Sequence, residues 1–155
     1  MEYHNLSYPY AVVSSFKSVL DSNTISTFTI GTTDFSNYNF YVVVKHRNSI
    51  ETWKKAAVSF GRGGAVKIVR FIDSAGSPYG NNLKQVGSKY FMYSGDVNQD
   101  GTINLIDVTS IYNDSVEGLT GYRNTDLNGD RVVNLADLLI AYNNAAGFVS
   151  VKKPH

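Results

Sequence analysis

The sequence contains no cysteine, so it forms no disulfide framework and no zinc or iron–sulfur site built on thiolates. It also lacks an excess of charge, because the formal net charge is +1 and no basic block or stripe occurs. Nucleic acid and anionic membrane surfaces are therefore poor candidates for partners. No apolar run reaches the roughly eighteen residues of a spanning helix, so no membrane span is predicted.

The composition is nevertheless that of a folded protein. Hydrophobic residues make up 43% and aromatic residues 13% of the chain, which supplies a core and argues against disorder. A length of 155 residues suffices for one ordinary domain or two small ones. The start of the sequence lacks a charged segment followed by an apolar one, so no signal peptide is predicted. We expect the chain to be a part of a larger protein.

Residues 1–93 are predicted to form an all-β antiparallel domain. Short runs rich in β-branched and aromatic residues alternate with turns rich in Gly, Asn, Asp and Ser. Several short strands at this spacing indicate a sandwich or a barrel, and we favour the sandwich. The predicted strands are Tyr10–Val13, Ile25–Ile30, Phe40–Val44, Ala56–Phe60, Val66–Ile72 and Lys89–Tyr93.

Residues 94–155 change to two copies of a loop followed by a short helix. The loops run from Asp96 to Asp107 and from Asp126 to Asp137, with oxygen-bearing side chains at positions 1, 3, 5, 9 and 12 of both. This is the spacing with which a loop of about twelve residues surrounds Ca²⁺. The predicted ligands of two calcium ions are Asp96, Asn98, Asp100, the carbonyl of Thr102, Asn104 (through a water) and Asp107, and then Asp126, Asn128, Asp130, the carbonyl of Val132, Asn134 and Asp137.

The two loops differ at their sixth position. Gly101 suits the left-handed backbone that a sharp turn favours, whereas Arg131 stands at the matching place of the second loop. A residue with a side chain is strained in that conformation, so the second site is expected to be the weaker one. Every ligand position is retained in it.

Apolar residues recur behind each loop at spacings of three and four, which places them on one face of a helix. Each helix is too short to persist alone in water. We therefore expect the two faces to pack together, with a calcium ion in each loop. The residues are Leu105, Val108, Ile111 and Tyr112 in the first copy, and Leu135, Leu138, Ala141 and Tyr142 in the second.

Neither loop is preceded by a segment that looks like an entering helix, and each closes with aspartate instead of glutamate. A loop with only an exiting helix, present twice and ending at Asp107 or Asp137, is the F-hand arrangement. In this respect residues 95–150 resemble a type I dockerin. Dockerins are noncatalytic adaptors that bind cohesin modules. The resemblance implies a calcium-dependent interaction module of a secreted protein, extracellular or on a bacterial cell surface.

The resemblance also suggests which residues contact the partner. In dockerins, loop positions 10 and 11 help to select the cohesin, and they fall here on Leu105, Ile106, Leu135 and Ala136. Leu105 and Leu135 have a second interpretation as core residues, whereas Ile106 and Ala136 are expected to be exposed. The basic pair that often follows in such helices is missing. The near-symmetry of the copies would permit two binding orientations.

The first half carries a resemblance of its own. The segments Tyr41–Trp53, Pro78–Val86 and Tyr93–Gly101 resemble the C-terminal regions of large secreted bacterial proteins. In those proteins a transthyretin-like β-sandwich runs directly into a dockerin-like repeat. The arrangement is also similar to an X module that stabilises a neighbouring dockerin. Because almost no linker separates Met92 from Asp96, we expect the two halves to pack rigidly.

The cluster of His46, Arg47, Glu51 and Trp53 suggests other functions. No nucleophile, base and orienting group can be assembled from it, so an enzyme is not predicted. Trp53 or a nearby tyrosine would suit sugar stacking, which makes a carbohydrate-binding β-module with a calcium-stabilised appendage one alternative. A cell-surface sorting or attachment domain without a cohesin partner is another. The interpretation that we favour is structural: His46 and Arg47 bond loop carbonyls or pair with Glu51, and Trp53 is buried against the sandwich or the helices.

Overall fold

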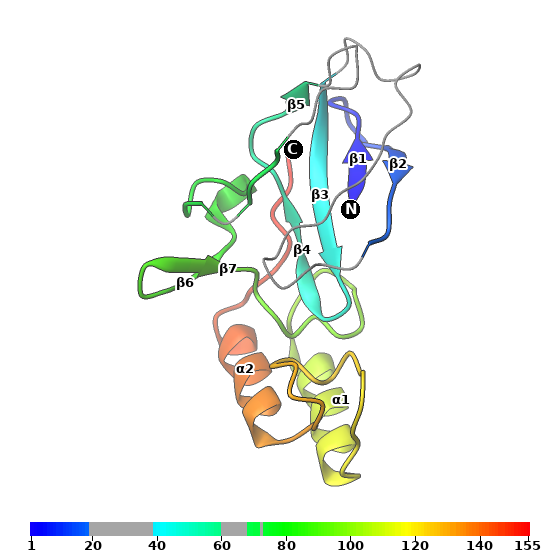
Figure 1. Ribbon diagram of the computed structural model, residues 1–155, viewed down its shortest axis with the longest axis vertical. Helices are drawn as coiled ribbons and strands as arrows, with labels where there is room; N and C mark the ends of the chain where they lie inside the picture. The colour runs from blue at the N-terminus through cyan, green and yellow to red at the C-terminus, as the bar shows by residue number, and fades with distance from the viewer. Residues whose placement is uncertain (19–38, 60–67, 72) are drawn as a thin grey trace.

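The chain has an antiparallel β part followed by two helices (Figure 1). The computed structural model describes residues 1–18, 39–59, 68–71 and 73–155. The main sheet has five strands in the order β2-β1-β3-β4, with β5 paired to β3, and all pairings are antiparallel. Its strands are β1 Glu2–His4, β2 Val12–Ser15, β3 Asn39–His46, β4 Ser49–Trp53 and β5 Val58–Ser59.

Strand β3 organises this sheet because it pairs with β1, β4 and β5. Its sequence is rich in valine, which suits a pleated and buried strand. One face of the sheet buries a cluster formed by Tyr3, Phe40, Val42 and Val58, against which Phe16 packs. The rings of Tyr3 and Phe16 meet edge to face with centroids 5.5 Å apart.

A separate hairpin leads from the sheet to the helices. Strands β6 (Lys84–Val86) and β7 (Lys89–Phe91) pair antiparallel around Gly87, whose φ of +60° lies in the left-handed region that a tight turn uses. The short 3₁₀ helix η1 (Tyr79–Asn81) precedes it. This hairpin brings the chain to the first loop.

The two helices are α1 (Leu105–Val116) and α2 (Leu135–Ala146), and they pack against each other (Figure 1). Neither helix has the length and apolar content to cross a bilayer, and the described part of the chain contains no other candidate. Their shared core consists of Val97, Ile111, Val133 and Ala141, with Val108, Leu119, Leu127 and Leu138 packed around it. Each repeat thus contributes one loop residue and one helix residue to the centre.

The predicted helical face is correct at four positions and wrong at four. Ile111 and Ala141 are fully buried, and Val108 and Leu138 pack beside them. The exposed positions are Leu105, Tyr112, Leu135 and Tyr142. The physical reason is that Asp107 and Asp137 point inward, each four residues before a buried apolar residue, so the buried face is centred on a carboxylate and not on the leucine that begins the helix.

The strand predictions have mixed outcomes. Phe40–Val44 is confirmed within β3, and the predictions at Tyr10–Val13, Ala56–Phe60 and Lys89–Tyr93 overlap β2, β5 and β7, respectively. Ile25–Ile30 lies outside the described residues, and residues 68–71 of the Val66–Ile72 prediction contain no strand. Strands β1, β4 and β6 were missed, since their short segments contain charged residues that do not suggest a strand. The described strands form a sheet and a hairpin, so the sandwich remains a prediction.

The end of the chain returns from the helices to the β part. Thr52 in β4 and Lys152 form a parallel bridge, and Asn82 Nδ2 donates to the carbonyl of Ser150 over 3.1 Å. The hydroxyl of Tyr10 donates to the carbonyl of His155 over 2.6 Å. Further backbone bonds link Ile50 N to Tyr93 O and Gly95 N to Asn48 O. These contacts support the expected close packing of the two halves.

The helical core gives a first test. Replacing Ile111 by alanine removes a fully buried side chain from the centre of the cluster, so the free energy of unfolding is expected to fall by about 2–4 kcal/mol. Urea denaturation measures the change. Tyr112→Ala, on the exposed side of the same helix, serves as the matched control and is expected to change stability by less than about 0.5 kcal/mol. Equal losses in the two variants would contradict the packing described.

Candidate calcium-binding loops

Each loop ends in a capped helix start. The side chains of Asn104 and Asn134 accept hydrogen bonds from the backbone N–H of Ile106 and Ala136, both over 2.7 Å. The carboxylates of Asp107 and Asp137 accept in turn from the N–H of Asn104 and Asn134, both over 3.0 Å. Loop positions 9 and 12 therefore form a capping box that fixes where each helix begins.

The closing aspartates also hold the beginning of each loop. Oδ1 of Asp107 accepts from the N–H groups of Val97 (2.9 Å) and Asn98 (3.3 Å). Oδ1 of Asp137 accepts from Leu127 (2.8 Å) and Asn128 (3.0 Å). Both carboxylates are 0% exposed. Each one thus joins the first residues of its loop to the first turn of its helix.

The opening aspartates bind the sharp turn in the middle of each loop. Asp96 accepts from the N–H groups of Asp100 (3.1 Å) and Gly101 (3.2 Å). Asp126 accepts from Gly129 (2.8 Å) and Arg131 (3.1 Å). Both carboxylates are buried, at 2% exposed. The backbone N–H groups of the turn therefore point at a carboxylate in both copies.

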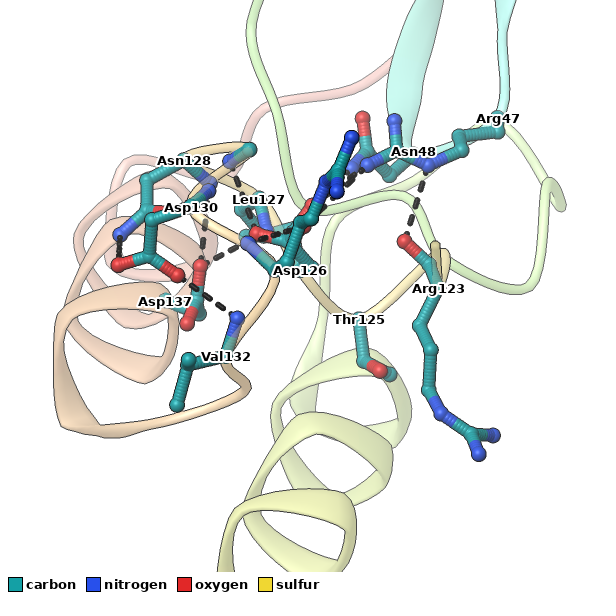
Figure 2. Close-up of polar contacts among 12 residues, drawn as sticks. Arg47, Asn48, Arg123, Thr125, Asp126, Leu127, Asn128, Asp130, Val132 and Asp137 are labelled. Carbon is teal, nitrogen blue, oxygen red and sulfur yellow. Dashed lines mark hydrogen bonds and ion pairs between the residues drawn. The ribbon is translucent and has the colours of Figure 1, made fainter. Parts of the chain in front are cut away.

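The exposed rim of each loop repeats as well. Asn98 accepts from the N–H of Asp100 over 3.0 Å and donates to its carboxylate over 2.8 Å, while Asp100 accepts from the N–H of Thr102 over 2.9 Å. In the second copy, Asn128, Asp130 and Val132 form the same three bonds over 2.8, 3.0 and 2.8 Å (Figure 2). Hydrogen bonds within each loop thus involve all six of its predicted ligand residues.

The backbone strain predicted for Arg131 is present, but it does not distinguish the loops. Arg131 has a φ of +70°, and Gly101 at the same position has +88°. Two residues earlier the roles are exchanged, because Gln99 has a φ of +59° where the second loop has Gly129 at +81°. Each loop thus holds one glycine and one strained residue in the left-handed region.

Charge compensation does distinguish the two loops. Burial raises the pKa of Asp96 to about 6. The negative charges of Asp107 and Asp100 also raise this pKa, whereas the N–H bonds from Gly101 and Asp100 lower it. Among the described residues no cationic side chain pairs with a carboxylate of the first loop, whereas Arg47 lies 3.8 Å from Asp126 in the second. A divalent cation would supply the positive charge that the carboxylates of the first loop lack.

The donor set fits calcium better than a softer metal. The described residues contain no group of three His, Cys, Asp or Glu side chains that converges as a metal centre. The loops offer carboxylate, amide and main-chain oxygens, a mixture that calcium accepts. Oδ2 of Asp107 and of Asp137 each accepts one N–H bond described above and retains a lone pair for this purpose.

The predicted partner-contacting residues are all exposed. Leu105 and Leu135 are 74% and 72% exposed, and Ile106 and Ala136 are exposed beside them. The two leucines therefore do not belong to the core, which decides between the two interpretations. They lie in the first turn of α1 and α2, next to the capped loop ends.

The cluster of His46, Arg47, Glu51 and Trp53 is dispersed among structural contacts. Trp53 is 3% exposed and donates from Nε1 to Glu51, which also pairs with Lys45 over 3.1 Å. Burial and the charge of Arg47 lower the pKa of His46, whose Nδ1 lies 2.9 Å from Oδ1 of Asn48. Trp53 offers no free ring face for a sugar.

Sequence reasoning expected Arg47 to bond loop carbonyls, as it does, but did not place it or its neighbours against the candidate calcium loops. The turn between β3 and β4 places Arg47 and Asn48 against the second loop, and Ser49 at the start of β4 contacts the first. Gln99 Nε2 donates to the carbonyl of Ser49 over 3.3 Å and to that of Asp96 over 2.5 Å. The turn and the second loop are far apart in the chain, and no local pattern signals such a contact.

The raised pKa of Asp96 predicts a pH dependence in calcium-free buffer. Between pH 4 and 6 the folded state holds a proton on Asp96 that the unfolded chain has lost, so this contribution to the free energy of unfolding falls as pH rises. Relative to Asp96→Asn, the wild type is expected to lose about 1–3 kcal/mol across this window. Urea denaturation at several pH values in EGTA measures it. A difference between the two proteins that stays constant with pH would contradict it.

Comparisons with protein family models, with curated proteins and with solved structures gave no match to this chain. The chemical interpretation therefore depends on the two loops themselves. The two loops support each other as evidence, because matching residues make the same hydrogen bonds in both copies.

Proposed function

We propose that the chain is a noncatalytic, calcium-dependent protein–protein interaction module that attaches a secreted protein to a cohesin-like receptor or another extracellular assembly. The observation that carries this proposal is the pair of loops with matching hydrogen bonds, each leading into a helix whose first turn exposes apolar side chains. One loop of this kind is readily explained as a turn. Two loops with the same residue spacing, each with buried aspartates, are better explained as a pair of cation sites.

Calcium would act on this surface through the loop ends. The carboxylate oxygens would coordinate the ion, and its positive charge would compensate the buried carboxylates, which in the first loop have no cationic side chain of the described residues beside them. Asp107 and Asp137 belong both to the predicted ligand set and to the helix caps. Occupancy of the loops would therefore fix the start of each helix, where the exposed apolar residues lie.

The exposed sides of the helices support a protein partner. Apolar and small residues follow one side of each helix at spacings of four, three and four, which makes a continuous stripe. Exposed apolar stripes of this kind are uncommon on surfaces that bind nothing. In α1 the stripe is Leu105, Thr109, Tyr112 and Val116, and in α2 it is Leu135, Leu139, Tyr142 and Ala146. Because the stripes match, a partner could engage the module in two orientations.

A cell-surface sorting or attachment domain without a cohesin partner is the second candidate. The contacts between the end of the chain and β4 favour it, because they make the loops part of one body with the sheet. In that case calcium would stiffen the protein, and the helical stripes would have another role. Secretion and a calcium requirement are common to both candidates.

Calcium binding is tested first. Titration calorimetry in chelator-treated buffer is expected to register two ions, and calcium at about a hundred times its dissociation constant adds roughly 2.7 kcal/mol per site to stability. The double variant Asp100→Asn with Asp130→Asn alters one exposed candidate ligand per loop and is expected to lose most of this gain. Asp73→Asn, an exposed aspartate outside the loops, serves as the control. A melting curve that EGTA leaves unmoved would show that calcium has no role.

Partner binding is tested with a panel of cohesin modules immobilised for interferometry. We expect one of them to bind in calcium and to be released by EGTA. Ile106→Asp combined with Ala136→Asp places charges on both exposed helix starts and is expected to weaken binding at least about tenfold without lowering the melting temperature. Asn113→Asp combined with Asn143→Asp adds the same charge elsewhere on the exposed helices as a control. If no cohesin binds while calcium does, the attachment domain is the better proposal.

A further inference from the structure

The turn between β3 and β4 reaches the second loop with a guanidinium group. Arg47 Nη2 donates to the carbonyl of Asp126 over 3.0 Å, and its Nε donates to the carbonyl of Arg123 over 2.9 Å (Figure 2). The same Nη2 lies 3.8 Å from Oδ2 of the Asp126 carboxylate. A fixed positive charge from the β part therefore stands beside the opening carboxylate of this loop.

Several contacts keep this charge in place. The guanidinium carbon lies 4.4 Å from the centre of the Tyr122 ring, a cation–π arrangement. Asn48 Nδ2 donates to the same Asp126 carbonyl over 2.9 Å, and the carbonyl of Asn48 accepts from Gly95 N over 2.7 Å. Arg47 is only 21% exposed and the Asp126 side chain 2%, so solvent screens the pair incompletely. The contact is built into the junction of the two halves.

The first loop meets the same turn only through neutral groups. Gln99 Nε2 donates to the carbonyl of Ser49, and Gly95 donates to that of Asn48. Within the described part of the chain, the carboxylates of Asp96, Asp100 and Asp107 form no ion pair. The two loops, almost identical in their internal bonds, therefore differ in the charge that the β part presents to them.

We propose that Arg47 is a built-in counter-cation of the second loop, which makes the two calcium sites unequal. The inference rests on the proposed calcium binding and deepens it. Arg47 compensates Asp126 before any ion arrives, so the second loop is ordered without calcium. The same charge repels a divalent ion, so the second loop binds calcium more weakly and fills after the first. Backbone strain does not produce this order, because Gln99 and Arg131 distribute it evenly.

As a consequence, the two loops would respond to different calcium concentrations. The first loop depends on calcium for its charge balance and responds at low calcium concentration. The second is held by the β part and responds only when calcium is higher. The surface formed by the starts of α1 and α2 would then be completed in two steps, with the half nearer the α2 start completed last.

The test follows each loop separately by ¹H–¹⁵N NMR during calcium titration of the whole chain. The amide of Gly101 reports the first loop and that of Gly129 the second. In the wild type, Gly101 is expected to reach its midpoint at lower calcium than Gly129. Arg47→Gln removes the charge and retains an amide donor, and it is expected to lower the Gly129 midpoint by about tenfold while Gly101 moves less than about twofold.

Matched variants separate charge from packing. Arg47→Lys keeps the charge and is expected to keep the wild-type order of filling, whereas Lys89→Gln removes an exposed charge on β7 and is expected to leave both midpoints unchanged. In EGTA, hydrogen exchange at the Arg131 amide is expected to quicken in Arg47→Gln. Two responsive loops with a Gly129 midpoint unmoved or raised in Arg47→Gln would overturn this inference alone. No response of either amide to calcium would overturn it together with the proposed function.

Discussion

The buried carboxylate at the end of each loop is the contact on which the helical half depends. Asp107 and Asp137 accept N–H bonds from the start of their own loop and from the N-cap residue of their own helix. A carboxylate that satisfies three backbone donors fixes the loop and the helix relative to each other. Its burial also requires that the remaining negative charge be compensated. The same two residues therefore fix the loop geometry and create the need for a compensating charge.

The β part contributes direct contacts to both loops. Its residues 47–49, a turn and the start of β4, lie against both loops, and the last residues pair with β4. The loops are thus supported from outside by main-chain carbonyls, an amide and one guanidinium. The two loops have almost the same internal hydrogen bonds but differ in charge environment, because among the described residues only the second has a cationic side chain beside a carboxylate.

Much of the candidate site could be predicted from the sequence. The positions of the oxygen-bearing residues, the absence of a preceding helix and the helix starts at Leu105 and Leu135 all follow local patterns. Short-range patterns succeed here because capping and loop closure involve residues within about a dozen positions of one another. The fold of the first half was harder to predict, since β1 pairs with β3 across a long stretch of chain and its few residues carry little signal.

The sequence by itself determined the two loops, their residue types and the helices that follow, because these depend on spacing within one segment. Tertiary structure alone decided that Leu105 and Leu135 face solvent, since the inward position of a carboxylate set the rotation of each helix. It also decided that Arg47 stands beside Asp126. Contacts between distant segments depend on how the whole chain packs, and no local pattern encodes them.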